Sequence, residues 1–389
     1  MTIVKDSIHD YIELRPMAEA LLDTAPMQRL RSIRQLSTVQ LVYPSANHTR
    51  FEHSLGVYHL AAESVETLGI DDGLAARVRA AALVHDVGHG PFGHQTEAVI
   101  ERHLGRHHDE IDWLLEETDL GTVLDDHGVD PAGVAATVDG RGPLGDLVSG
   151  ALDVDRMDYL VRDAHHTGVP YGTIDHARLL YALRLIDGEL ALAEGNVATA
   201  ESALIARTLM NATVYRHHVS RIAGALLDRA SERLLADGAI TPERFARLTD
   251  AELLAALDDH ERTADVASRL RERRLYKRAI WARREVVPDA LVGLEYGEAR
   301  TLEREIADAA GVDAAAVILD SPDEPASPES RARIVVDGEP VRLEDRSSLV
   351  SGLDACAQDI WRLGVYAPPD AVSDVRDAAV AVLDVDSKA

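Results

Sequence analysis

The sequence has almost no cysteine and no long apolar run. Cys356 is the single cysteine among 389 residues, so the chain forms no intrachain disulfide and no cysteine-rich zinc site. No apolar stretch reaches the roughly 20 residues that a membrane-spanning helix needs, and no charged-then-apolar signal segment opens the chain. We therefore expect a cytoplasmic protein without a membrane partner.

Lysine is also scarce. Lys5, Lys277 and Lys388 are the only lysines among 40 basic residues, and 67 acidic residues leave a formal net charge of -27. Such a surface is typical of a halophilic source, where salt screens self-repulsion, although a generally acidic protein is the alternative. It repels long nucleic acids, and no basic stretch with interleaved aromatics offsets this. A small phosphorylated partner needs only a few local arginines.

Four residues of metal-ligand type occur in three separate blocks. His53 lies in RFEHSLG, His85 and Asp86 are adjacent in LVHDVGHGPFGH, and Asp155 lies in DVDRMDYLVRD. Two imidazoles and two carboxylates can hold one divalent ion and leave positions open for water and phosphate oxygens. This pattern indicates a metal-dependent phosphohydrolase.

The residues around the His-Asp pair support a ligand role over chance or packing. The pair ends an apolar run, AARVRAAALV, and ionisable groups at such a place are usually paired or bound to a metal. His89 follows His85 by four residues, as in zinc proteases, but Asp86 stands where those have glutamate and the glycines weaken the helix. His89 and His94 are better candidates for phosphate donors or acid groups, although one of them could instead satisfy a buried hydrogen bond.

These blocks resemble the HD-domain phosphohydrolases, in the branch of the deoxynucleoside triphosphate (dNTP) triphosphohydrolases. The resemblance begins at VKDSIHDYIEL, continues through LLDTAPMQRLRSIRQLSTVQLVYPSANHTRFEHSLGV, HDVGHGPFGH and LDVDRMDYLVRDAHHTGVPYG, and ends near TLMNATVYRHHV. It implies one divalent metal ion per chain. The nitrogen and oxygen ligand set suits Mn, Fe, Co, Ni or Zn, with Mg as a weaker substitute.

The resemblance also implies partners. Its members act on nucleotides and assemble through the HD core, so we expect a dNTP substrate and a homo-oligomer. Asp23, Gln28 and Arg31 match positions near the family's nucleotide activator site, which leaves activation by a nucleotide open.

Helical spacing groups further polar residues. Asp155, Tyr159 and Asp163 are four residues apart, so they share one face of a helix expected over residues 155–164, and Arg207 and Tyr215 fall at matching intervals on a later helix. Each of them alone could serve core packing or a surface ion pair. The resemblance implies substrate contacts for a larger set: Gln35, Leu36, Arg50, Arg156, Tyr159, Asp163, Arg207 and Tyr215.

The resemblance assigns acid chemistry to a second group. His94 is similar to the family's acid that protonates the departing 5′-oxygen, and Glu97, one helical turn later, would orient it. His108 is similar to another active-site histidine, and His89 would lie close by. With Arg50 and Arg207 binding the phosphates, the products would be a deoxynucleoside and triphosphate.

Three classes of function stay open. The first is dNTP triphosphohydrolysis. The second is an HD phosphohydrolase or phosphodiesterase that acts on another nucleotide or phosphoester, and the third is a nucleotide-binding regulator without turnover. The complete ligand set argues against the third class, and Gln35, Tyr159, Asp163 and Tyr215 together favour the first over the second.

The expected fold class is mainly α. We predict an HD-type helical core at 1–236 with a short hairpin at LRLIDGELALAEGN, where Asp187-Gly188 is a good turn pair. A helical extension at 237–290 follows. Alternating helix and strand patterns then predict a small α+β domain at 291–389, with an exposed loop at 321–330.

Overall fold

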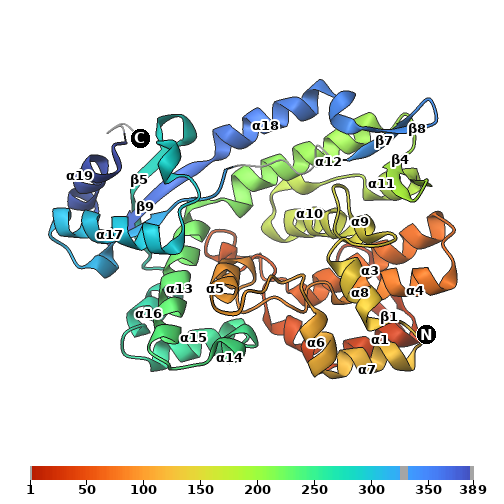
Figure 1. Ribbon diagram of the computed structural model, residues 1–389, viewed down its shortest axis with the longest axis horizontal. Helices are drawn as coiled ribbons and strands as arrows, with labels where there is room; N and C mark the ends of the chain where they lie inside the picture. The colour runs from red at the N-terminus through yellow and green to blue at the C-terminus, as the bar shows by residue number, and fades with distance from the viewer. Residues whose placement is uncertain (1, 325–331, 386–389) are drawn as a thin grey trace.

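The computed structural model of the protein describes residues 2–324 and 332–385. It is mainly helical, which confirms the predicted fold class (Figure 1). The helices up to the middle of the chain are α1 (Pro16–Leu22), α2 (Ala25–Arg29), α3 (Arg50–Thr67), α4 (Asp72–Val84), α5 (His94–Leu104), α6 (Asp112–Glu117), α7 (Asp119–Asp126), α8 (Pro131–Val138), α9 (Gly145–Val148) and α10 (Val154–Thr167). Those that follow are α11 (His176–Ala182), α12 (Val197–Met210), α13 (His218–Ala236), α14 (Pro242–Ala246), α15 (Asp250–Asp259), α16 (Ala264–Arg271), α17 (Tyr296–Ala310), α18 (Ser348–Ile360) and α19 (Val372–Leu383).

The strands form three small sheets. The N-terminal pair is β1 (Thr2–Asp6) with β2 (Asp10–Leu14). The second sheet has the order β3-β4-β7-β8, with β3 (Leu183–Ile186), β4 (Glu189–Leu192), β7 (Arg333–Val336) and β8 (Glu339–Arg342). The third has the order β5-β9-β6, with β5 (Lys277–Arg283), β9 (Arg362–Ala367) and β6 (Ile318–Asp320).

Helices α3, α4 and α10 pack together and carry the metal-ligand residues. A capping box starts α3, in which Glu52 accepts hydrogen bonds from the backbone N–H and hydroxyl of Thr49. The Asp71 carboxylate caps the start of α4, and the Asp153 carboxylate caps the start of α10. Each of the three helices therefore begins at a defined residue, which fixes the side chains on its first turns.

The predicted hairpin near residue 187 is confirmed. Strands β3 and β4 pair antiparallel, and Asp187 and Gly188 both have positive φ, 52° and 84°. These angles suit the two-residue turn that matches the twist of paired strands. The same sheet continues into β7 and β8, and α18 packs on α12, so residues 333–360 return to the helical core.

Several elements differ from the sequence prediction. The N-terminal hairpin β1–β2 differs from the prediction, because the sequence indicates a helical core over this region. The helical pattern of the sequence also predicts long helices over residues 200–236 and 250–274. The first of these is two helices in the structure, since a π-turn at Asn211–Tyr215 ends α12 and His217 becomes extended. The helix expected over 250–274 is also interrupted, because the chain is extended at His260.

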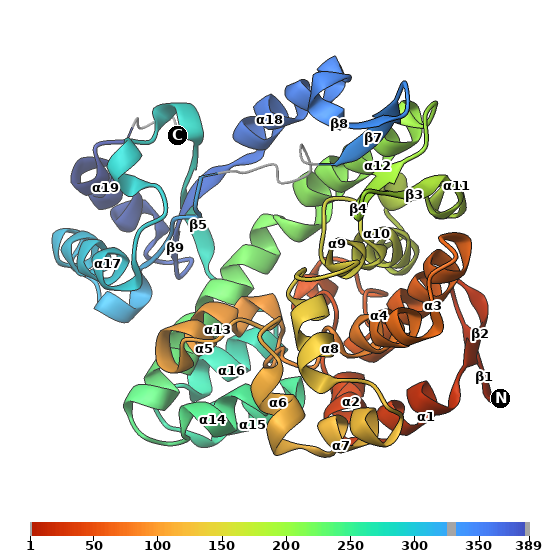
Figure 2. The ribbon, with the colours of Figure 1, turned by 45° about the vertical axis from the view of Figure 1, so that its right-hand side comes forward.

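The C-terminal part of the chain is organised around the third sheet. Helices α17 and α19 lie beside β5 and β9, while α18 runs away from them toward β7 and β8 (Figures 1 and 2). Strand β5 begins at Lys277, so the segment predicted as a helical extension ends in a strand of this sheet. The three-part domain division stays a prediction. The predicted loop at 321–330 lies mostly outside the described residues.

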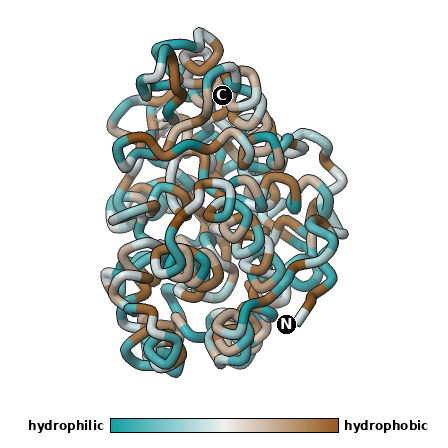
Figure 3. Tube along the Cα trace, turned by 90° about the vertical axis from the view of Figure 1, so that its right-hand side faces the viewer, coloured by the Kyte–Doolittle hydropathy of each residue, from teal (hydrophilic) through white to brown (hydrophobic). Residues whose placement is uncertain are grey.

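Apolar side chains collect in three clusters. One fills the helical core around α3, α4 and α10, one lies between α5 and α13 to α16, and one lies under the third sheet. Hydrophobic and hydrophilic stretches are interspersed along the chain in Figure 3, as expected for helices with one buried face. Within the described ranges, every helix is too short or too polar to cross a bilayer.

Candidate metal centre and substrate site

The structure brings the four predicted ligand residues together. His53 comes from the first turn of α3, His85 and Asp86 follow the end of α4, and Asp155 lies on the first turn of α10. The two Nε2 atoms of His53 and His85 are 3.3 Å apart. The Asp155 Oδ1 atom lies 2.8 Å from the first and 3.7 Å from the second. An Asp86 oxygen lies 3.4 Å from His85 Nε2, so ligand-type atoms from three segments meet at one point.

The hydrogen bonds of the two imidazoles fit a metal at this point. His85 Nδ1 donates to the carbonyl of Ala82 (2.9 Å), and His53 Nδ1 donates to Asp158 Oδ2 (2.8 Å). Each ring therefore uses its Nδ1 for the protein and turns its Nε2 toward the other ring, where a cation satisfies both lone pairs. His53 and Asp86 are buried, whereas the Asp155 side chain is 32% exposed. The cluster is open to solvent on the Asp155 side.

Hydrogen bonds and ion pairs shift the pKa values of the groups in this cluster. Burial alone would lower the pKa of His53, but hydrogen bonds with Asp155 and Asp158 outweigh it and raise the pKa to about 10. Burial alone would raise the pKa of Asp86, yet Arg50 and the neighbouring histidines hold it well below its ordinary value. The carboxylates thus stay ionised, and their field favours a cation between the two imidazoles.

Sequence analysis missed the residues behind His53. Asp158 is fully buried and accepts hydrogen bonds from His53, from His9 (2.7 Å) and from both Nε and Nη2 of Arg162 (2.8 and 2.9 Å). Arg162 in turn donates to both carboxylate oxygens of Asp6. The sequence marks Asp158 only weakly as a site residue, because an Asp three residues after Asp155 is equally compatible with the exposed face of a helix.

Gly56 makes this close approach of α3 and α10 possible. A Cβ atom at this position would lie 1.9 Å from Asp158 Oδ1 and 2.5 Å from Arg162 Nη2. Gly56→Ala should therefore push the helices apart and lower the free energy of unfolding by about 1–3 kcal/mol. Gly73→Ala, on α4 where only Asp71 Oδ1 lies within 4 Å, is the matched control and should change stability by less than about 1 kcal/mol. Guanidinium chloride unfolding would measure both, and equal losses would contradict the packing role of Gly56.

Arg50 connects the metal ligands to a second group of histidines. Its Nη1 donates to Asp86 Oδ2 at 2.8 Å, and the side chain is 2% exposed. Gly93, with φ 52°, makes room for it, since a Cβ there would lie 2.4 Å from Arg50 Nη2. Within the described residues, Arg50 Nε is a buried donor without a hydrogen-bond acceptor. Such a donor is suited to an anionic ligand oxygen.

The predicted acid group also assembles. Glu97 accepts from Nδ1 of His94 (2.7 Å) and from Nδ1 of His108, which holds the two rings at about a right angle. His89 stacks on His108 with ring centroids 4.0 Å apart. Burial would lower the pKa of His108, but Glu97 outweighs it and raises the pKa, while burial and Arg50 hold the pKa of His89 well below 6.5. The pKa values of these two stacked histidines are thus shifted in opposite directions.

His89, His94 and His108 could by spacing alone hold a second metal, since their nitrogens lie within 4.8 Å of one another. Charge argues otherwise. The guanidinium of Arg50 is close enough to lower the pKa of His89, and a positive group at this place also repels a further cation. We interpret this group as a site that favours an anion over a second metal ion.

The loop between Asp86 and His94 is held from a distant segment. Asp250, at the start of α15, accepts from the backbone N–H groups of Phe92 (2.6 Å) and Arg34 (3.1 Å). Arg29 donates to the carbonyl of His89 and to those of residues 246 and 248. Phe92 has a positive φ of 60°, which is strained for a residue with a side chain. These contacts keep the acid group beside the metal ligands.

The predicted sugar-facing residues lie farther along α10. Tyr215 donates to Asp163 Oδ2 at 2.8 Å, and His48 bonds the other carboxylate oxygen at 2.7 Å. The rings of Tyr159 and Tyr215 meet edge to face, with centroids 6.0 Å apart. His48 was not predicted, because it lies in a loop and follows no helical spacing.

The remaining predicted contacts surround these two tyrosines. Arg156 donates to Asp153 at 3.0 Å and hydrogen-bonds Tyr159, and Arg207 is near enough to both tyrosines to lower the pKa that burial raises. The backbone N–H of Gln35 donates to the carbonyl of His48, which places Gln35 beside the Asp163 partner. Within the described chain, Gln35 Oε1 is a buried acceptor without a donor. Leu36 is buried in the helical core.

Two other features lie apart from this arrangement. Gln28 and Arg31, predicted near an activator site, hydrogen-bond each other at 2.9 Å, with Asp23 at the end of α1.

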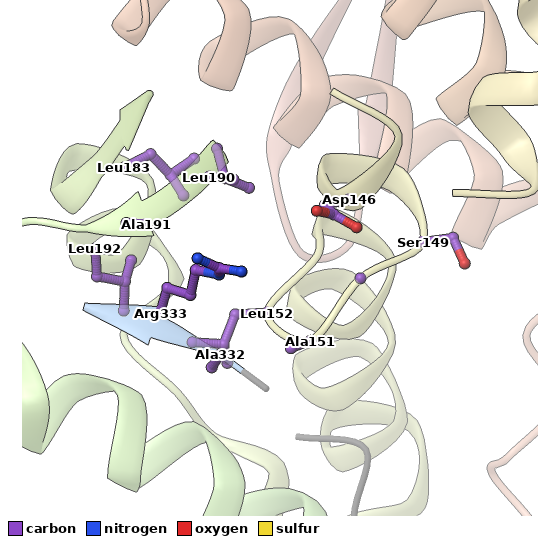
Figure 4. Close-up of a pocket in the computed structure, with 11 residues that line it drawn as sticks. Asp146, Ser149, Ala151, Leu152, Leu183, Leu190, Ala191, Leu192, Ala332 and Arg333 are labelled. Atoms are coloured by element: carbon purple, nitrogen blue, oxygen red, sulfur yellow. The ribbon is translucent and has the colours of Figure 1, made fainter. Parts of the chain in front are cut away.

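A cavity of about 390 Å³ lies between the α9 segment and the β3-β4-β7 sheet, with Asp146 and Arg333 on opposite walls (Figure 4). Its lining contains no predicted site residue.

Comparison with known proteins places this arrangement in a family. The model of the HD domain matches residues 50–163, and the model of the HD associated region matches residues 174–389. The chain therefore belongs to the HD-domain proteins that carry this associated region. Residues 50–163 contain all four metal-ligand positions, so fold and site indicate a metal-dependent hydrolase of the phosphohydrolase fold.

Three relatives illustrate the range of similarity. MJ1154 of Methanocaldococcus jannaschii is 30% identical over 387 residues, covering 97% of this chain and 81% of that protein. The human deoxynucleoside triphosphate triphosphohydrolase SAMHD1 is 28% identical over 315 residues, covering 67% of this chain and 48% of that protein. The crystal structure of a phosphohydrolase from Bacteroides thetaiotaomicron has a TM-score of 0.75 at 25% identity and covers 95% of this chain and all of that one.

Proposed function

We propose that the protein hydrolyses dNTPs to a deoxynucleoside and triphosphate, by attack at the phosphorus nearest the sugar. One observation carries this proposal: α10 presents Asp155 to the metal ligands and, one turn or about 6 Å along the same face, Tyr159. Asp163 follows after another turn and is fixed by Tyr215 and His48. Phosphate-binding and sugar-binding groups are thus spaced along one rigid helix.

His53, His85, Asp86 and Asp155 would hold the divalent ion. Their mixed nitrogen and oxygen donors suit Mn, Fe, Co, Ni or Zn better than Ca, with Mg as a weaker substitute. When bound, such an ion neutralises phosphate charge and lowers the pKa of a water molecule. The two Nε2 atoms lie 3.3 Å apart and face the carboxylates of Asp86 and Asp155, and this convergence is the part of the structure that the ion would explain.

The chain's own residues would perform the other tasks. Arg50, anchored on Asp86 through Nη1, keeps its buried Nε for a phosphate oxygen, and Arg207 adds a second guanidinium near the tyrosines. His94 is held by Glu97 through Nδ1, so its Nε2 is left to deliver a proton to the departing 5′-oxygen. Glu97 thus orients the acid and also accepts a hydrogen bond from Nδ1 of His108.

Sugar selection would come from Gln35, Leu36, Tyr159, Asp163 and Tyr215. The unpaired Oε1 of Gln35 is a buried acceptor suited to a ligand donor, and the apolar side chain of Leu36 leaves little to satisfy an additional ribose hydroxyl. These residues favour a dNTP over another phosphoester. A regulator without turnover fits less well, because the ligand residues and both acid-group histidines are in place.

The substrate class can be tested by incubating the protein with each dNTP and each NTP in high salt with Mn²⁺ or Mg²⁺. We expect dNTPs to be cleaved about 10- to 100-fold faster than the matching NTPs, and chromatography to resolve triphosphate as the product. Gln35→Ala should lower this ratio of dNTP to NTP cleavage rates. Release of orthophosphate or pyrophosphate first would assign the protein to the second class of phosphohydrolase.

The proposed function includes partners and setting. We propose a homo-oligomer, as in the dNTP triphosphohydrolase branch, in the cytoplasm of a salt-adapted cell. Asp23, Gln28 and Arg31 are the residues at which a nucleotide activator would be sought. A long nucleic acid stays an unlikely partner for a chain with 67 acidic and 40 basic residues.

A further inference from the structure

We propose that the N-terminal hairpin is part of the metal centre, with His9 and Asp6 as positioning residues that fix the ligand His53. This inference rests on the proposed metal-binding function of His53. The hairpin lies at the edge of the molecule beside α3 (Figure 2), and its turn reaches inward to α10. No predicted site residue lies in this hairpin, which is a segment outside the predicted site.

Asp158 connects the hairpin to His53. Its carboxylate accepts four hydrogen bonds, one from His53 Nδ1, one from His9 Nε2 and two from Arg162. A carboxylate has about four acceptor positions, so this one is saturated. His53 is therefore bound to a carboxylate that the other three donors hold in place. A ligand histidine oriented in this way presents its second nitrogen in a fixed direction.

Asp6 holds Arg162 in the same manner. Arg162 donates to both Asp6 oxygens, at 2.9 and 3.2 Å, while the backbone N–H groups of Ile8 and His9 also donate to Asp6 at 2.9 Å each. The last two bonds form the hairpin turn. One carboxylate thus fixes both the turn that carries His9 and the guanidinium that orients Asp158.

Burial makes this arrangement difficult to replace by water. The side chains of Arg162 and Asp158 are completely buried, and those of His9 and Asp6 are 2% and 5% exposed. Asp6 and His9 are 156 and 149 residues from their partners on α10, so only the packed hairpin brings them there. Since buried ion pairs need excellent geometry to form at all, loss of one donor should disturb the orientation of His53.

The test uses Mn²⁺ binding to the metal-free, full-length protein in high salt, followed by electron paramagnetic resonance of the free ion. His9→Phe removes the donor and keeps a ring, and Asp6→Asn removes the charge that holds Arg162. We expect each to weaken Mn²⁺ binding about 10- to 100-fold, the usual effect of losing an outer partner of a metal ligand. His9→Gln, which retains a donor, should recover most of the affinity.

Matched controls lie on the same hairpin. Lys5 and Asp10 form an exposed ion pair, with side chains 58% and 85% exposed. Asp10→Asn should leave Mn²⁺ affinity within about twofold of the wild type. If circular dichroism shows that His9→Phe does not fold, the Mn²⁺ affinity of Asp6→Asn tests the inference, with the same expected 10- to 100-fold loss.

Two outcomes would overturn the inference: affinity within twofold of the wild type in His9→Phe and Asp6→Asn, or an equal loss in Asp10→Asn. A wild-type protein that binds no Mn²⁺ would instead contradict the proposed metal centre itself. The failure of the hairpin role and the failure of the function are therefore distinguishable.

Discussion

Asp86→Ala should remove the bound metal and lower the rate of phosphoester hydrolysis by about a thousandfold or more. Asp86 supplies oxygen atoms 3.4 Å from His85 Nε2 and 3.9 Å from His53 Nε2, so the change takes one charge from the centre of the cluster. An ion that neutralises phosphate charge lowers the activation barrier by several kcal/mol. Each 1.4 kcal/mol of barrier changes the rate by a factor of about ten. Metal analysis of the wild type should give one transition metal per chain.

The control for this variant must address Arg50. Asp86 is the carboxylate that pairs with this buried guanidinium, and its removal leaves a buried charge, which costs about 3–5 kcal/mol of stability. Asp86→Asn retains the shape and an acceptor for Arg50, so it separates loss of metal from loss of fold. Both variants should lack metal, with near-native circular dichroism for Asp86→Asn. Full metal occupancy in either variant would contradict the ligand assignment.

Removal of salt should first dissociate and then unfold the protein. The 67 acidic and 40 basic residues leave an excess of 27 negative charges, since 67 - 40 = 27. The Debye length grows from about 3 Å in 1 M salt to about 30 Å in 0.01 M salt, so charges that are screened in the first condition repel one another across the molecule in the second. Subunits that share this charge repel one another for the same reason.

Light scattering and circular dichroism along a dialysis series would measure both steps. Return of salt should restore the signal, whereas a neutral solute at equal osmolality should not, because it provides no screening ions. A stable, active monomer in both molar and millimolar salt would contradict the oligomer and the salt requirement together. Loss of activity with an unchanged oligomer would contradict only the prediction that dissociation comes before unfolding.

The sequence by itself determined the class of chemistry. The HD pair can be found without a structure because it ends an apolar run, where ionisable residues are otherwise unfavourable, and RFEH and DVD can be found by their resemblance to the family's other ligand blocks. The spacing of Asp155, Tyr159 and Asp163 likewise follows from the helical repeat. The hairpin at β3–β4 was visible because Asp187-Gly188 is a local turn signal.

Only the tertiary structure decided how these residues are held. His9, Asp6, His48 and Asp250 reach the site across 115 to 216 residues of sequence, and no local pattern marks them. The N-terminal hairpin was missed because its register is fixed by Asp6 and by packing, and the break after α12 was missed because the π-turn ends where Tyr215 bonds Asp163. Helical repeats and turns are set by neighbours along the chain, whereas the saturation of a buried carboxylate depends on which segments packing brings together.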